Sequence, residues 1–484
     1  MPMLLLSRKS VPTPNDFTEV QHALHGREFR AEELPFPEKR LKEYVNAGYV
    51  SVRHGIIPLN ENIFDLLTGK KKWLCVRCGN REQESFAVCS CARCGSKCVY
   101  CRHCLTMGIV RACTKLVTWC GPVPELRLPE DVLIGRPLCH WKGSLSSDQQ
   151  KAAEALLQAL EARESFLIWA VAGAGKTEII YSALEQQLKK GHRVVLATPR
   201  TDVVRELLPR IRAAFPDIPV SGLYAGSKET IPDAPLVIST AHQLIRSANR
   251  FDCVFIDEVD AFPYHFDAML DYAVRKAAKP NAPFIFLTAT PPDILKNAYL
   301  SGKLRGVMLA RRYHGYPLPV PRFQWIGNGA HAACKGWLPY PLSLWLRERI
   351  TQKRQAFIFV PSIALVHELT ELLQRSGYTR IAGVHADDPH RHEKLADFRE
   401  GRLAALVTTT ILERGVTVPG VEVAVFGADD RVFDDRALVQ ISGRVGRSGD
   451  CPRGDVVFFH NGKTLAMIRA RRQIEQMNRA GGFK

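Results

Sequence analysis

A run of apolar residues at Phe166–Val171 leads directly into a short loop that is rich in glycine. The amphipathic segment Glu178–Lys190 follows, so the pattern predicts a buried strand, a tight loop and a helix in that order. Glycines let such a loop wrap tightly, and its N–H groups and the helix N-terminus then point at phosphate oxygens. The loop consists of Ala172, Gly173, Ala174, Gly175, Lys176 and Thr177. We expect it to cradle the phosphates of a nucleoside triphosphate.

Two side chains of this loop have predicted roles in holding the nucleotide. Lys176 would reach the β and γ phosphates, and the hydroxyl of Thr177 would bind Mg²⁺. Upstream, Gln149 lies at the start of a predicted helix and could hydrogen-bond an adenine edge, which would select ATP. The alternative for this segment is a helix cap formed by Ser147 or Asp148, with Gln149 exposed.

An acidic group follows another apolar run. Cys253–Ile256 is typical of a buried strand, and residues 257–260 read Asp-Glu-Val-Asp. Carboxylates at the carboxyl end of a strand lie where parallel sheets bind ligands. We expect Asp257 to hold Mg²⁺ and Glu258 to orient and deprotonate the attacking water, because phosphoryl transfer depends on positioning and charge neutralisation.

From about residue 140, short apolar runs alternate with longer amphipathic segments, which predicts an α/β fold with parallel strands and crossover helices. A looser basic and proline-rich region, Leu309–Pro341, divides the pattern into two halves. The expected strands are Phe166–Val171, Arg193–Ala197, Leu236–Ser239, Cys253–Ile256, Phe284–Leu287, Ala356–Val360, Arg380–Val384, Ala404–Thr408 and Val421–Phe426.

Two arginines in the second half could complete the nucleotide site. Residues 440–447 read Gln-Ile-Ser-Gly-Arg-Val-Gly-Arg on a predicted helix, which would place Arg444 and Arg447 on similar faces. A guanidinium stays charged and pairs with phosphate, so one or both would stabilise charge on the transferring phosphoryl group. The alternative is a basic surface patch. Hydroxyl residues at Thr288–Thr290 could link the metal site to this second half.

The formal net charge of +17 over 484 residues favours an anionic partner, either nucleic acid or an anionic membrane surface. No stretch approaches the roughly 20 apolar residues that a membrane-spanning helix needs. The three leucines near the start are too few for a signal sequence. We therefore expect a cytoplasmic protein.

Eight of the 14 cysteines fall between Cys75 and Cys104. In a long cytosolic chain, clustered Cys-x-x-Cys pairs predict metal ligands rather than disulfides. The outer two pairs are expected to form one tetrahedral zinc site, with the ligands Cys75, Cys78, Cys101 and Cys104. A second zinc site is the alternative for the inner cysteines, which are Cys89, Cys91, Cys94 and Cys98. Iron–sulfur ligation and a redox disulfide set are the rival interpretations.

Two groups of residues suit nucleic-acid contact. Basic residues surround the cysteines: Arg77, Arg81, Arg93, Lys97, Arg102, Arg111 and Lys115. Hydroxyl residues follow predicted strands at Thr198–Arg200, Ser239–Thr240, Phe359–Ser362 and Thr408–Val416. Such groups contact the sugar–phosphate backbone, which carries no sequence information.

The assembled motifs resemble the ComFA late-competence family of helicase superfamily 2. This family is related to the PriA helicases. The resemblance runs from about Cys75 to Met477. It rests on the cysteine module and on residues 168–178, 197–204, 257–263 and 408–419. It implies two tandem RecA-like domains, with parallel sheets of the P-loop NTPase type, behind a small zinc-binding module.

What the resemblance implies is an ATP-driven motor on single-stranded DNA that helps to internalise transforming DNA. The implied partners are a DNA-uptake channel at the membrane and other competence proteins, with peripheral association at the inner face of the membrane. A homo-oligomer is a further option. The expected divisions are an N-terminal region 1–70, a zinc-binding module 71–120, a linker 121–139, RecA-like domains 140–312 and 313–462, and a C-terminal helix 463–484.

Three other functions stay open at this point. The first is a PriA-like replication-restart helicase, although the cysteine module of such proteins usually lies within the second motor half and here it precedes the phosphate loop. The second is a zinc-dependent DNA-binding adaptor whose ATPase serves as a switch. The third is an RNA helicase, which a comparison of RNA and DNA as stimulants of ATP hydrolysis would distinguish.

Overall fold

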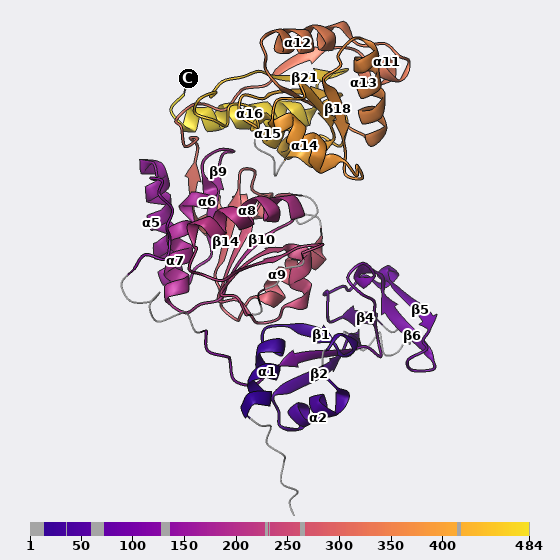
Figure 1. Ribbon diagram of the computed structural model, residues 1–484, viewed down its shortest axis with the longest axis vertical. Coiled ribbons are helices and arrows are strands. Elements are labelled where there is room, and N and C mark those ends of the chain that lie inside the picture. Colours follow the sequence, from indigo (N-terminus) through magenta and orange to yellow (C-terminus); the bar gives the residue numbers. More distant parts are fainter. Residues whose placement is uncertain are drawn as a thin grey trace, which may run out of the picture. The chain divides into compact units, whose positions relative to one another are not determined.

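The computed structural model describes most of the chain, and Figure 1 shows the course of its backbone. The described residues are 14–34, 36–59, 72–126, 136–227, 231, 233–261, 267–413 and 418–483. They form two compact units. The first draws its residues from Met1–Gly143, Leu156–Phe166 and Tyr181–Phe286, and the second from Ser144–Ala155, Leu167–Ile180 and Leu287–Lys484.

A three-stranded antiparallel sheet with the order β1-β8-β2 organises the N-terminal region. Its apolar side chains pack with those of two helices. In the register, His54 at the end of β2 lies directly opposite Lys115 at the start of β8, so the chain returns to this sheet beside the point where it left. The elements are α1 (Pro14–Leu24), β1 (Glu28–Arg30), η1 (Ala31–Glu33), α2 (Glu38–Asn46), β2 (Val50–His54) and β8 (Lys115–Trp119).

The cysteine-rich segment occupies the excursion between β2 and β8. It contains two small antiparallel sheets, β3-β4 and β5-β6-β7. Its elements are β3 (Ile56–Leu59), β4 (Lys72–Cys75), η2 (Gln83–Ser85), β5 (Phe86–Ser90), β6 (Lys97–Cys101), η3 (Arg102–Cys104) and β7 (Val110–Arg111). The predicted zinc-binding module at 71–120 thus includes β8, a strand that pairs with the N-terminal sheet.

A seven-stranded sheet follows, with the order β11-β12-β10-β13-β14-β9-β15. The pairs of β10 with β12 and β13, and of β11 with β12, are parallel. Its strands are β9 (Phe166–Ala170), β10 (Val194–Thr198), β11 (Val220–Leu223), β12 (Leu236–Thr240), β13 (Cys253–Asp257), β14 (Phe284–Thr288) and β15 (Arg305–Leu309). The accompanying helices are α5 (Ser147–Glu161), α6 (Lys176–Ile179), α7 (Tyr181–Lys189), α8 (Thr201–Ala214), η4 (Ala241–Arg246), α9 (Ala268–Ala277) and α10 (Asp293–Leu300).

The second sheet has six strands in the order β16-β21-β20-β17-β19-β18, and all its pairs are parallel. Its strands are β16 (Arg322–Trp325), β17 (Ala356–Phe359), β18 (Ile381–Val384), β19 (Ala405–Thr408), β20 (Glu422–Phe426) and β21 (Val456–His460). The helices are α11 (Gly329–Cys334), α12 (Tyr340–Thr351), α13 (Ile363–Arg375), α14 (Arg391–Arg399), η6 (Thr410–Glu413), α15 (Asp435–Ser442) and α16 (Leu465–Ala480).

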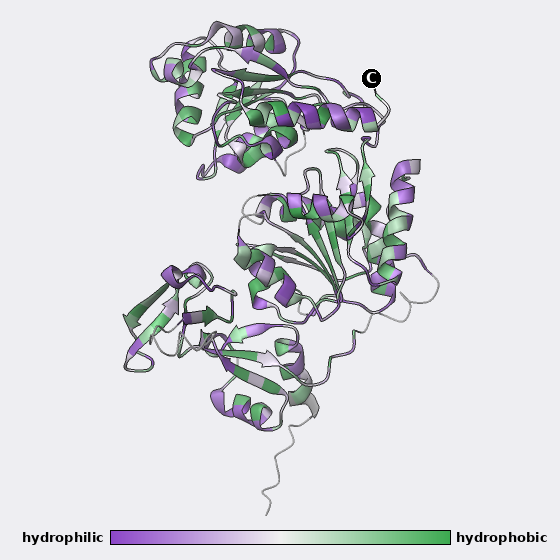
Figure 2. Cartoon of the chain, turned by 180° about the vertical axis from the view of Figure 1, so that it is seen from behind, coloured by the Kyte–Doolittle hydropathy of each residue, from purple (hydrophilic) through white to green (hydrophobic). Residues whose placement is uncertain are grey.

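The predicted α/β fold with two parallel-stranded halves is confirmed. Figure 2 shows hydrophobic residues concentrated on the strands of both large sheets, which is the pattern of strands buried on both faces. The region Leu309–Pro341 is more regular than its composition predicts. It contains α11 and the edge strand β16, whose short, half-exposed sequence gives a weak strand signal. No helix in the described part of the chain is long and apolar enough to span a bilayer.

Candidate functional site

The phosphate loop lies at the carboxyl end of β9, and glycine backbone conformations shape it. Gly173 and Gly175 have φ angles of +83° and +74°, in the left-handed region that favours glycine. A Cβ atom on Gly175 would also lie 2.4 Å from Nε2 of Gln149. Gly175 is the residue that precedes α6, so the loop turns directly into the helix that carries Lys176 and Thr177.

Gln149 holds this loop from α5. Its Nε2 donates to the carbonyl of Ala174 at 2.9 Å, and its Oε1 accepts from the N–H of Ser146 at 2.8 Å. The side chain is buried, so the alternative of an exposed Gln149 is wrong. Because both ends of its amide bind backbone groups, Gln149 positions the loop, and its adenine contact stays a prediction.

Lys176 and Thr177 occupy the first two positions of α6, and both are half-buried. The ammonium of Lys176 lies 3.5 Å from the carbonyl oxygen of Ala170 at the end of β9. That carbonyl directs the side chain back across the loop rather than out along the helix. A lysine in this place can reach phosphates that bind to the loop N–H groups.

The acidic pair ends β13. Asp257 is the last residue of the strand, and Glu258 follows it with φ +56°, a rare conformation for a residue with a side chain. Two hydrogen bonds hold this turn: Glu258 N–H donates to Asp257 Oδ1 at 3.0 Å, and Ala261 N–H donates to the Glu258 carbonyl at 2.8 Å. Residues held in such strained conformations cluster at functional sites. Phe262 and Pro263, the last residues of the quoted 257–263 string, lie outside the described residues.

The paired arginines lie beyond a helix rather than on it. Helix α15 ends at Ser442, and Gly446 has φ +67°, so the expectation that Arg444 and Arg447 share a helix face is wrong. Arg444 is 1% exposed, and its Nε donates to the carbonyl of Glu413 at 3.0 Å. Arg447 is half-buried, and its Nε donates to the Gly443 carbonyl at 3.1 Å. The glycines at 443 and 446 end the helix and separate the two environments.

Within the second unit, the segment that carries these arginines approaches the phosphate loop. A Cβ atom on Gly443 would lie only 2.6 Å from the Cβ of Ala172. Gln440 Nε2 lies 3.5 Å from the hydroxyl of Thr290. The backbone N–H of Thr290 donates to Thr288 Oγ1 at 3.0 Å. The hydroxyl of Thr290 therefore lies beside Gln440, and the linking role of Thr288 and Thr290 stays a prediction.

The structure adds Arg312, a residue that the sequence analysis missed. Its guanidinium is 2% exposed and donates to the carbonyls of Val445 at 2.7 Å, Gly443 at 3.3 Å and Gly446. The N–H of the next residue, Tyr313, donates to the Gly173 carbonyl at 3.0 Å. Burial, with a smaller contribution from the charge of Arg447, lowers the pKa of Arg312 to about 9, so the side chain stays cationic at neutral pH. Arg312 lies in a basic stretch with no motif around it.

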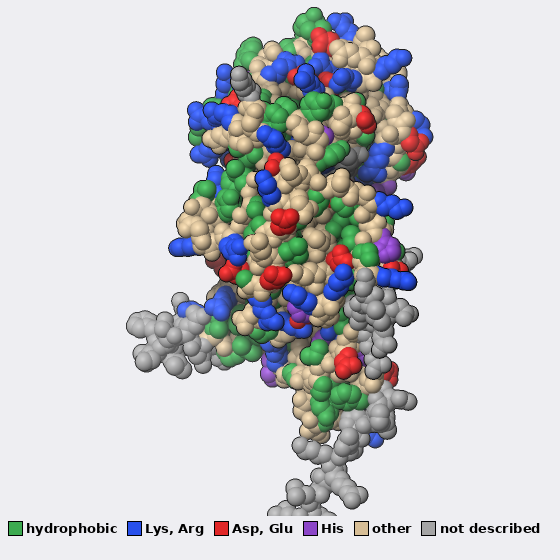
Figure 3. Space-filling view, turned by 90° about the vertical axis from the view of Figure 1, so that its left-hand side faces the viewer, with side chains coloured by type: hydrophobic (Ala, Val, Ile, Leu, Met, Phe, Trp, Pro, Cys, Tyr) green, Lys and Arg blue, Asp and Glu red, His purple; other side chains and the backbone are tan. Residues whose placement is uncertain are grey.

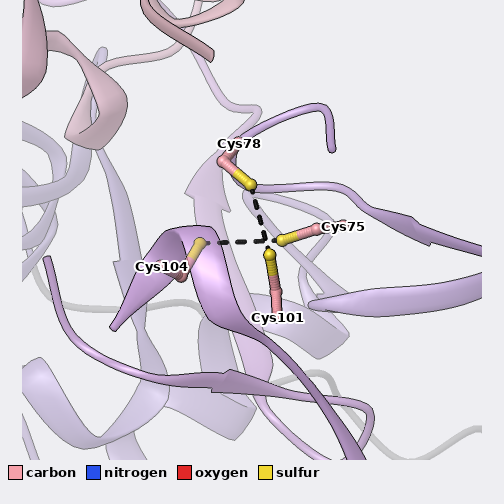
Figure 4. Close-up of side chains that lie close together, drawn as sticks. All are labelled: Cys75, Cys78, Cys101 and Cys104. Atoms are coloured by element: carbon pink, nitrogen blue, oxygen red, sulfur yellow. Dashed lines mark hydrogen bonds between the residues drawn. The ribbon is translucent and has the colours of Figure 1, made fainter. Parts of the chain in front are cut away.

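Four buried cysteines converge in the N-terminal region, as Figure 4 shows. All four sulfurs lie within 4.8 Å of one another, with Cys75 Sγ 3.7 Å from Cys104 Sγ and Cys78 Sγ 3.6 Å from Cys101 Sγ. Two thiolates bonded to one zinc at about 2.3 Å in tetrahedral geometry are separated by about 3.8 Å. The residues therefore fit a zinc ion. The contact with Cys104 lowers the pKa of Cys101, whereas the contacts with Cys101 raise the pKa of Cys78 and Cys104, so the support for zinc is the sulfur geometry.

This first cluster packs against α9 and η4, two helices that accompany the seven-stranded sheet. Ile245 and Ala273 belong to the same apolar cluster as the cysteines. Tyr272 Oη donates to the Val76 carbonyl at 2.9 Å. Lys276 Nζ, also on α9, donates to Glu28 Oε1 at 2.7 Å and to the Arg77 carbonyl at 2.9 Å. Burial lowers the pKa of Lys276, and the paired carboxylate opposes that shift.

Of the basic residues expected to contact DNA, Arg77 is wrongly assigned. Its side chain is 1% exposed and donates to the Gly108 carbonyl at 2.8 Å. Arg93 is exposed but pairs with Glu32 at 3.1 Å. Arg81, Lys97, Arg102 and Lys115 are exposed. Figure 3 shows Lys and Arg side chains spread over the face that it draws, with Asp and Glu among them.

The inner cysteines form a group whose membership differs from the predicted one. The sulfurs that lie within 4.8 Å of one another belong to Cys91, Cys94, Cys98 and Cys113. Cys89 is outside this group and Cys113 takes its place. In the second half, Thr408 ends β19, whereas Arg414, Gly415 and Val416 lie outside the described residues.

Three family models match the chain. A model described as the competence protein ComFA N-terminal domain matches residues 14–118. The model of the Type III restriction enzyme res subunit matches residues 142–293, and the helicase conserved C-terminal domain matches residues 342–449.

Relatives match over nearly the whole length. The chain is 41% identical over 460 residues to the competence protein ComFA of Bacillus subtilis, which covers 95% of each chain. It is 37% identical over 416 residues to that of Streptococcus pneumoniae, which covers 86% of this chain and 92% of the relative. The structure of S. cerevisiae Dbp5 bound to RNA and ADP BeF3 is similar in fold, with a TM-score of 0.52, 17% identity and coverage of 75% of this chain and 92% of that one.

Proposed function

The chain belongs to the ComFA family of competence proteins, and from that premise we propose that its phosphate loop, acidic pair and late arginines together hydrolyse ATP to move it along single-stranded DNA. It is a competence-associated, helicase-like DNA translocase of superfamily 2 and a DNA-dependent ATPase. The observation that carries the residue-level proposal is the loop at the end of β9, where two left-handed glycines turn the backbone directly into the helix of Lys176 and Thr177.

The loop at 172–177 binds the phosphates of ATP through its backbone N–H groups, while Gln149 holds it in shape and contacts the adenine edge. Lys176 moves from the Ala170 carbonyl to the β and γ phosphates, which it binds as a point charge. The hydroxyl of Thr177 and the carboxylate of Asp257 hold Mg²⁺. The ion supplies neutralisation of phosphate charge when bound.

Glu258 orients and deprotonates the attacking water. The strained backbone at this residue supports the role, because such a conformation persists only where the surroundings impose it, and the turn that imposes it also fixes the carboxylate next to Asp257. A glutamate is suited to this task since it is ionised at neutral pH and accepts a proton at the moment of attack.

Arg444 and Arg447 stabilise the charge that develops on the transferring phosphoryl group. Their different surroundings give them different tasks. Arg447, which is half-buried, reaches the phosphate directly, whereas Arg444 is anchored to the Glu413 carbonyl and joins it on closure. An arginine in this role is typically worth about 10³ to 10⁵ in rate.

Opening and closing of RecA-like domains at 140–312 and 313–462 would step them along the DNA backbone. Residues that follow the strand ends, among them Arg200 and Ser362, contact the phosphates. Thr198 and Thr240, which end β10 and β12 in register, are buried, so they support these segments from within the sheet. Contacts of this kind hold the backbone without reading the sequence.

The first cysteine cluster holds a structural zinc ion through Cys75, Cys78, Cys101 and Cys104. The sulfur spacing supports this assignment. Closed sites with four thiolates contribute to folding rather than to catalysis, by about 10 to 16 kcal/mol in small zinc-finger peptides. Here the ion would fix the surface that packs on α9 and η4.

The setting of the proposed activity is the uptake of transforming DNA. The motor would work at the inner face of the membrane beside a DNA-uptake channel, together with cytosolic competence proteins. The resemblance to the two ComFA relatives supports this setting. Co-purification of the full chain with the membrane fraction of competent cells, and its loss from that fraction when the uptake channel is deleted, would test the association.

The decisive experiment measures ATP hydrolysis by the full chain against the length of single-stranded DNA, with RNA and duplex DNA as controls. A translocase should hydrolyse ATP faster on longer single strands until the rate saturates. On a longer strand it takes more steps before it reaches the end and dissociates. A rate that is independent of length would favour an adaptor with a switch-like ATPase. Equal or stronger stimulation by RNA would contradict the preference for DNA.

A further inference from the structure

We propose that the chain holds a second structural zinc ion, in a site distinct from the first and independent of the proposed motor activity. The ligands are Cys91, Cys94, Cys98 and Cys113. These cysteines are not among the proposed ATP-site residues, so the absence of a second ion would leave the motor assignment unchanged.

The first observation is that the backbone at residues 91–96 repeats the backbone at residues 75–80, the turn of the first cluster. In each turn the carbonyl of the first cysteine accepts from the N–H of the glycine four positions later, at 2.8 Å in the first and 2.9 Å in the second. In each, the N–H of the first cysteine donates to the carbonyl five positions later, at 3.0 Å. Both glycines, Gly79 and Gly95, are left-handed, with φ of +74° and +68°.

The shape of this turn is the one that a pair of metal-binding cysteines needs. It brings the two sulfurs of a Cys-x-x-Cys pair to the same side, which is the arrangement of a zinc knuckle. Gly79 packs against the ring of Tyr272, so the first turn could owe its shape to packing. A Cβ on Gly95 would meet nothing within 4 Å. The second turn adopts the same shape without such a contact, which points to its cysteines as the reason.

The second observation is the convergence of the other two sulfurs on this turn. Cys113 Sγ lies 3.6 Å from Cys91 Sγ, close to the roughly 3.8 Å expected between two thiolates on one tetrahedral zinc. All four sulfurs lie within 4.8 Å of one another, as in the first cluster. Cys91 and Cys98 are buried, Cys113 is half-buried and Cys94 is exposed, so an ion can enter from the side of Cys94.

Strand β6 serves both clusters. Cys98 and Cys101 are three positions apart on it, and side chains alternate between the two faces of a strand. They therefore point to opposite faces, Cys98 towards the second cluster and Cys101 towards the first. The ligands interleave along the chain, because three ligands of the second site lie between the two halves of the first. Two ions in this arrangement would brace one small hairpin from both faces.

The position of Cys113 shows what the second ion would connect. Cys113 lies in the turn between β7 and β8, next to Ala112, whose N–H donates to the Val99 carbonyl on β6 at 2.9 Å. The site therefore joins the β5–β6 hairpin to the chain just before it re-enters the N-terminal sheet. The ion pair of Arg93 with Glu32 lies beside the same turn and ties it to that sheet region. The first cluster packs against α9 and η4, whereas Cys113 of the second lies in the turn that leads into β8.

Zinc is the ion that this donor set favours. Four thiolates in a tetrahedral arrangement select zinc or an iron–sulfur cluster over hard cations such as Mg²⁺ and Ca²⁺. Sulfur separations of at most 4.8 Å suit a single ion, because an iron–sulfur cluster holds the cysteines on its different irons further apart. Each bound thiolate releases a proton, so retention of the ion should weaken in acid.

The test counts zinc ions per full-length chain, prepared with reductant and added zinc, by native mass spectrometry and elemental analysis. We expect two ions in the natural protein and one in the double variant Cys94→Ser/Cys113→Ser. Cys89→Ser is the matched control: Cys89 lies directly opposite Cys98 in the β5–β6 register but outside the sulfur group, so this variant should keep two ions.

Cobalt substitution supplies a second readout that does not depend on activity. The thiolate-to-cobalt absorption should fall by about half in the double variant and stay unchanged in Cys89→Ser. If the double variant does not fold, the single Cys94→Ser variant, which changes an exposed side chain, should lose one ion to a chelator faster than the natural protein does. One ion in the natural protein, two in the double variant, a Cys91–Cys113 disulfide or an iron–sulfur chromophore would each overturn the proposal.

Discussion

Glu258 has a strained backbone conformation and is also the proposed base for the attacking water. A left-handed conformation costs a residue with a side chain about 1 to 3 kcal/mol, and here two hydrogen bonds of the turn hold it. We predict that Glu258→Gln keeps the fold and binds ATP, but hydrolyses it at least about a hundredfold more slowly, because the amide cannot take a proton from water. Single-turnover hydrolysis with a nucleotide-binding titration checks this. Glu154→Gln, an exposed change on α5, is the control, and near-normal turnover by Glu258→Gln would remove Glu258 from the mechanism.

Lys176 acts as a charge at the mouth of the loop. We predict that Lys176→Ala lowers hydrolysis by at least about a hundredfold, since removing one donor to a developing charge typically costs 10²- to 10³-fold. DNA binding without nucleotide should persist, because the DNA contacts lie elsewhere in the proposal. Lys190→Ala, an exposed lysine just past α7, should leave both properties unchanged. Normal turnover by Lys176→Ala would show that the loop does not bind the reacting phosphates.

Among the helices and strands, Arg312 connects the segment that follows β15 to the residues just after α15. Its buried guanidinium donates to three carbonyls between residues 443 and 446. We predict that Arg312→Gln destabilises the fold by about 3 kcal/mol, since hydrogen bonds to charged groups contribute about 1.5 to 3 kcal/mol each and a glutamine replaces only some of them. It should also slow ATP hydrolysis through displacement of Arg447.

Arg347→Gln is the matched control for that variant, because Arg347 is an exposed arginine on α12. Thermal unfolding and steady-state hydrolysis, measured on both variants, separate a local packing defect from a general loss of positive charge. Equal effects of the two substitutions would mean that the contacts of Arg312 with the end of α15 contribute neither to stability nor to ATP hydrolysis.

The same elements show what a sequence reveals and what it hides. The phosphate loop was predictable because its strand, glycines and helix are consecutive, so local rules determine its shape. The end of α15 at Ser442 was not, since Gly443 and Gly446 stop the helix in a segment whose motif suggested continuation. Arg312 and Cys113 acquire their surroundings from partners far along the chain, which no spacing rule connects to them.

At the scale of the whole molecule, the net charge of +17 sets the character of DNA binding. Proteins that neutralise phosphates with Lys and Arg release condensed counterions, so affinity falls steeply with salt. We predict a loss of roughly 300-fold in affinity for single-stranded DNA between about 50 and about 200 mM salt, if the protein makes about six phosphate contacts. Fluorescence anisotropy with mixed-sequence oligonucleotides at several salt concentrations measures the slope. An affinity that is insensitive to salt would contradict backbone recognition.

The pairing of His54 with Lys115 makes the cysteine-rich segment an insertion between two adjacent strands of one sheet. Residues 55–114 begin and end at directly opposed positions of one sheet, so in topology they form one long hairpin loop between β2 and β8. A two-residue turn could close the same strands. A change in the length of that loop leaves the register of β2 and β8 intact, whereas the contacts of Val76 and Arg77 with α9 restrict changes near the first cysteine cluster.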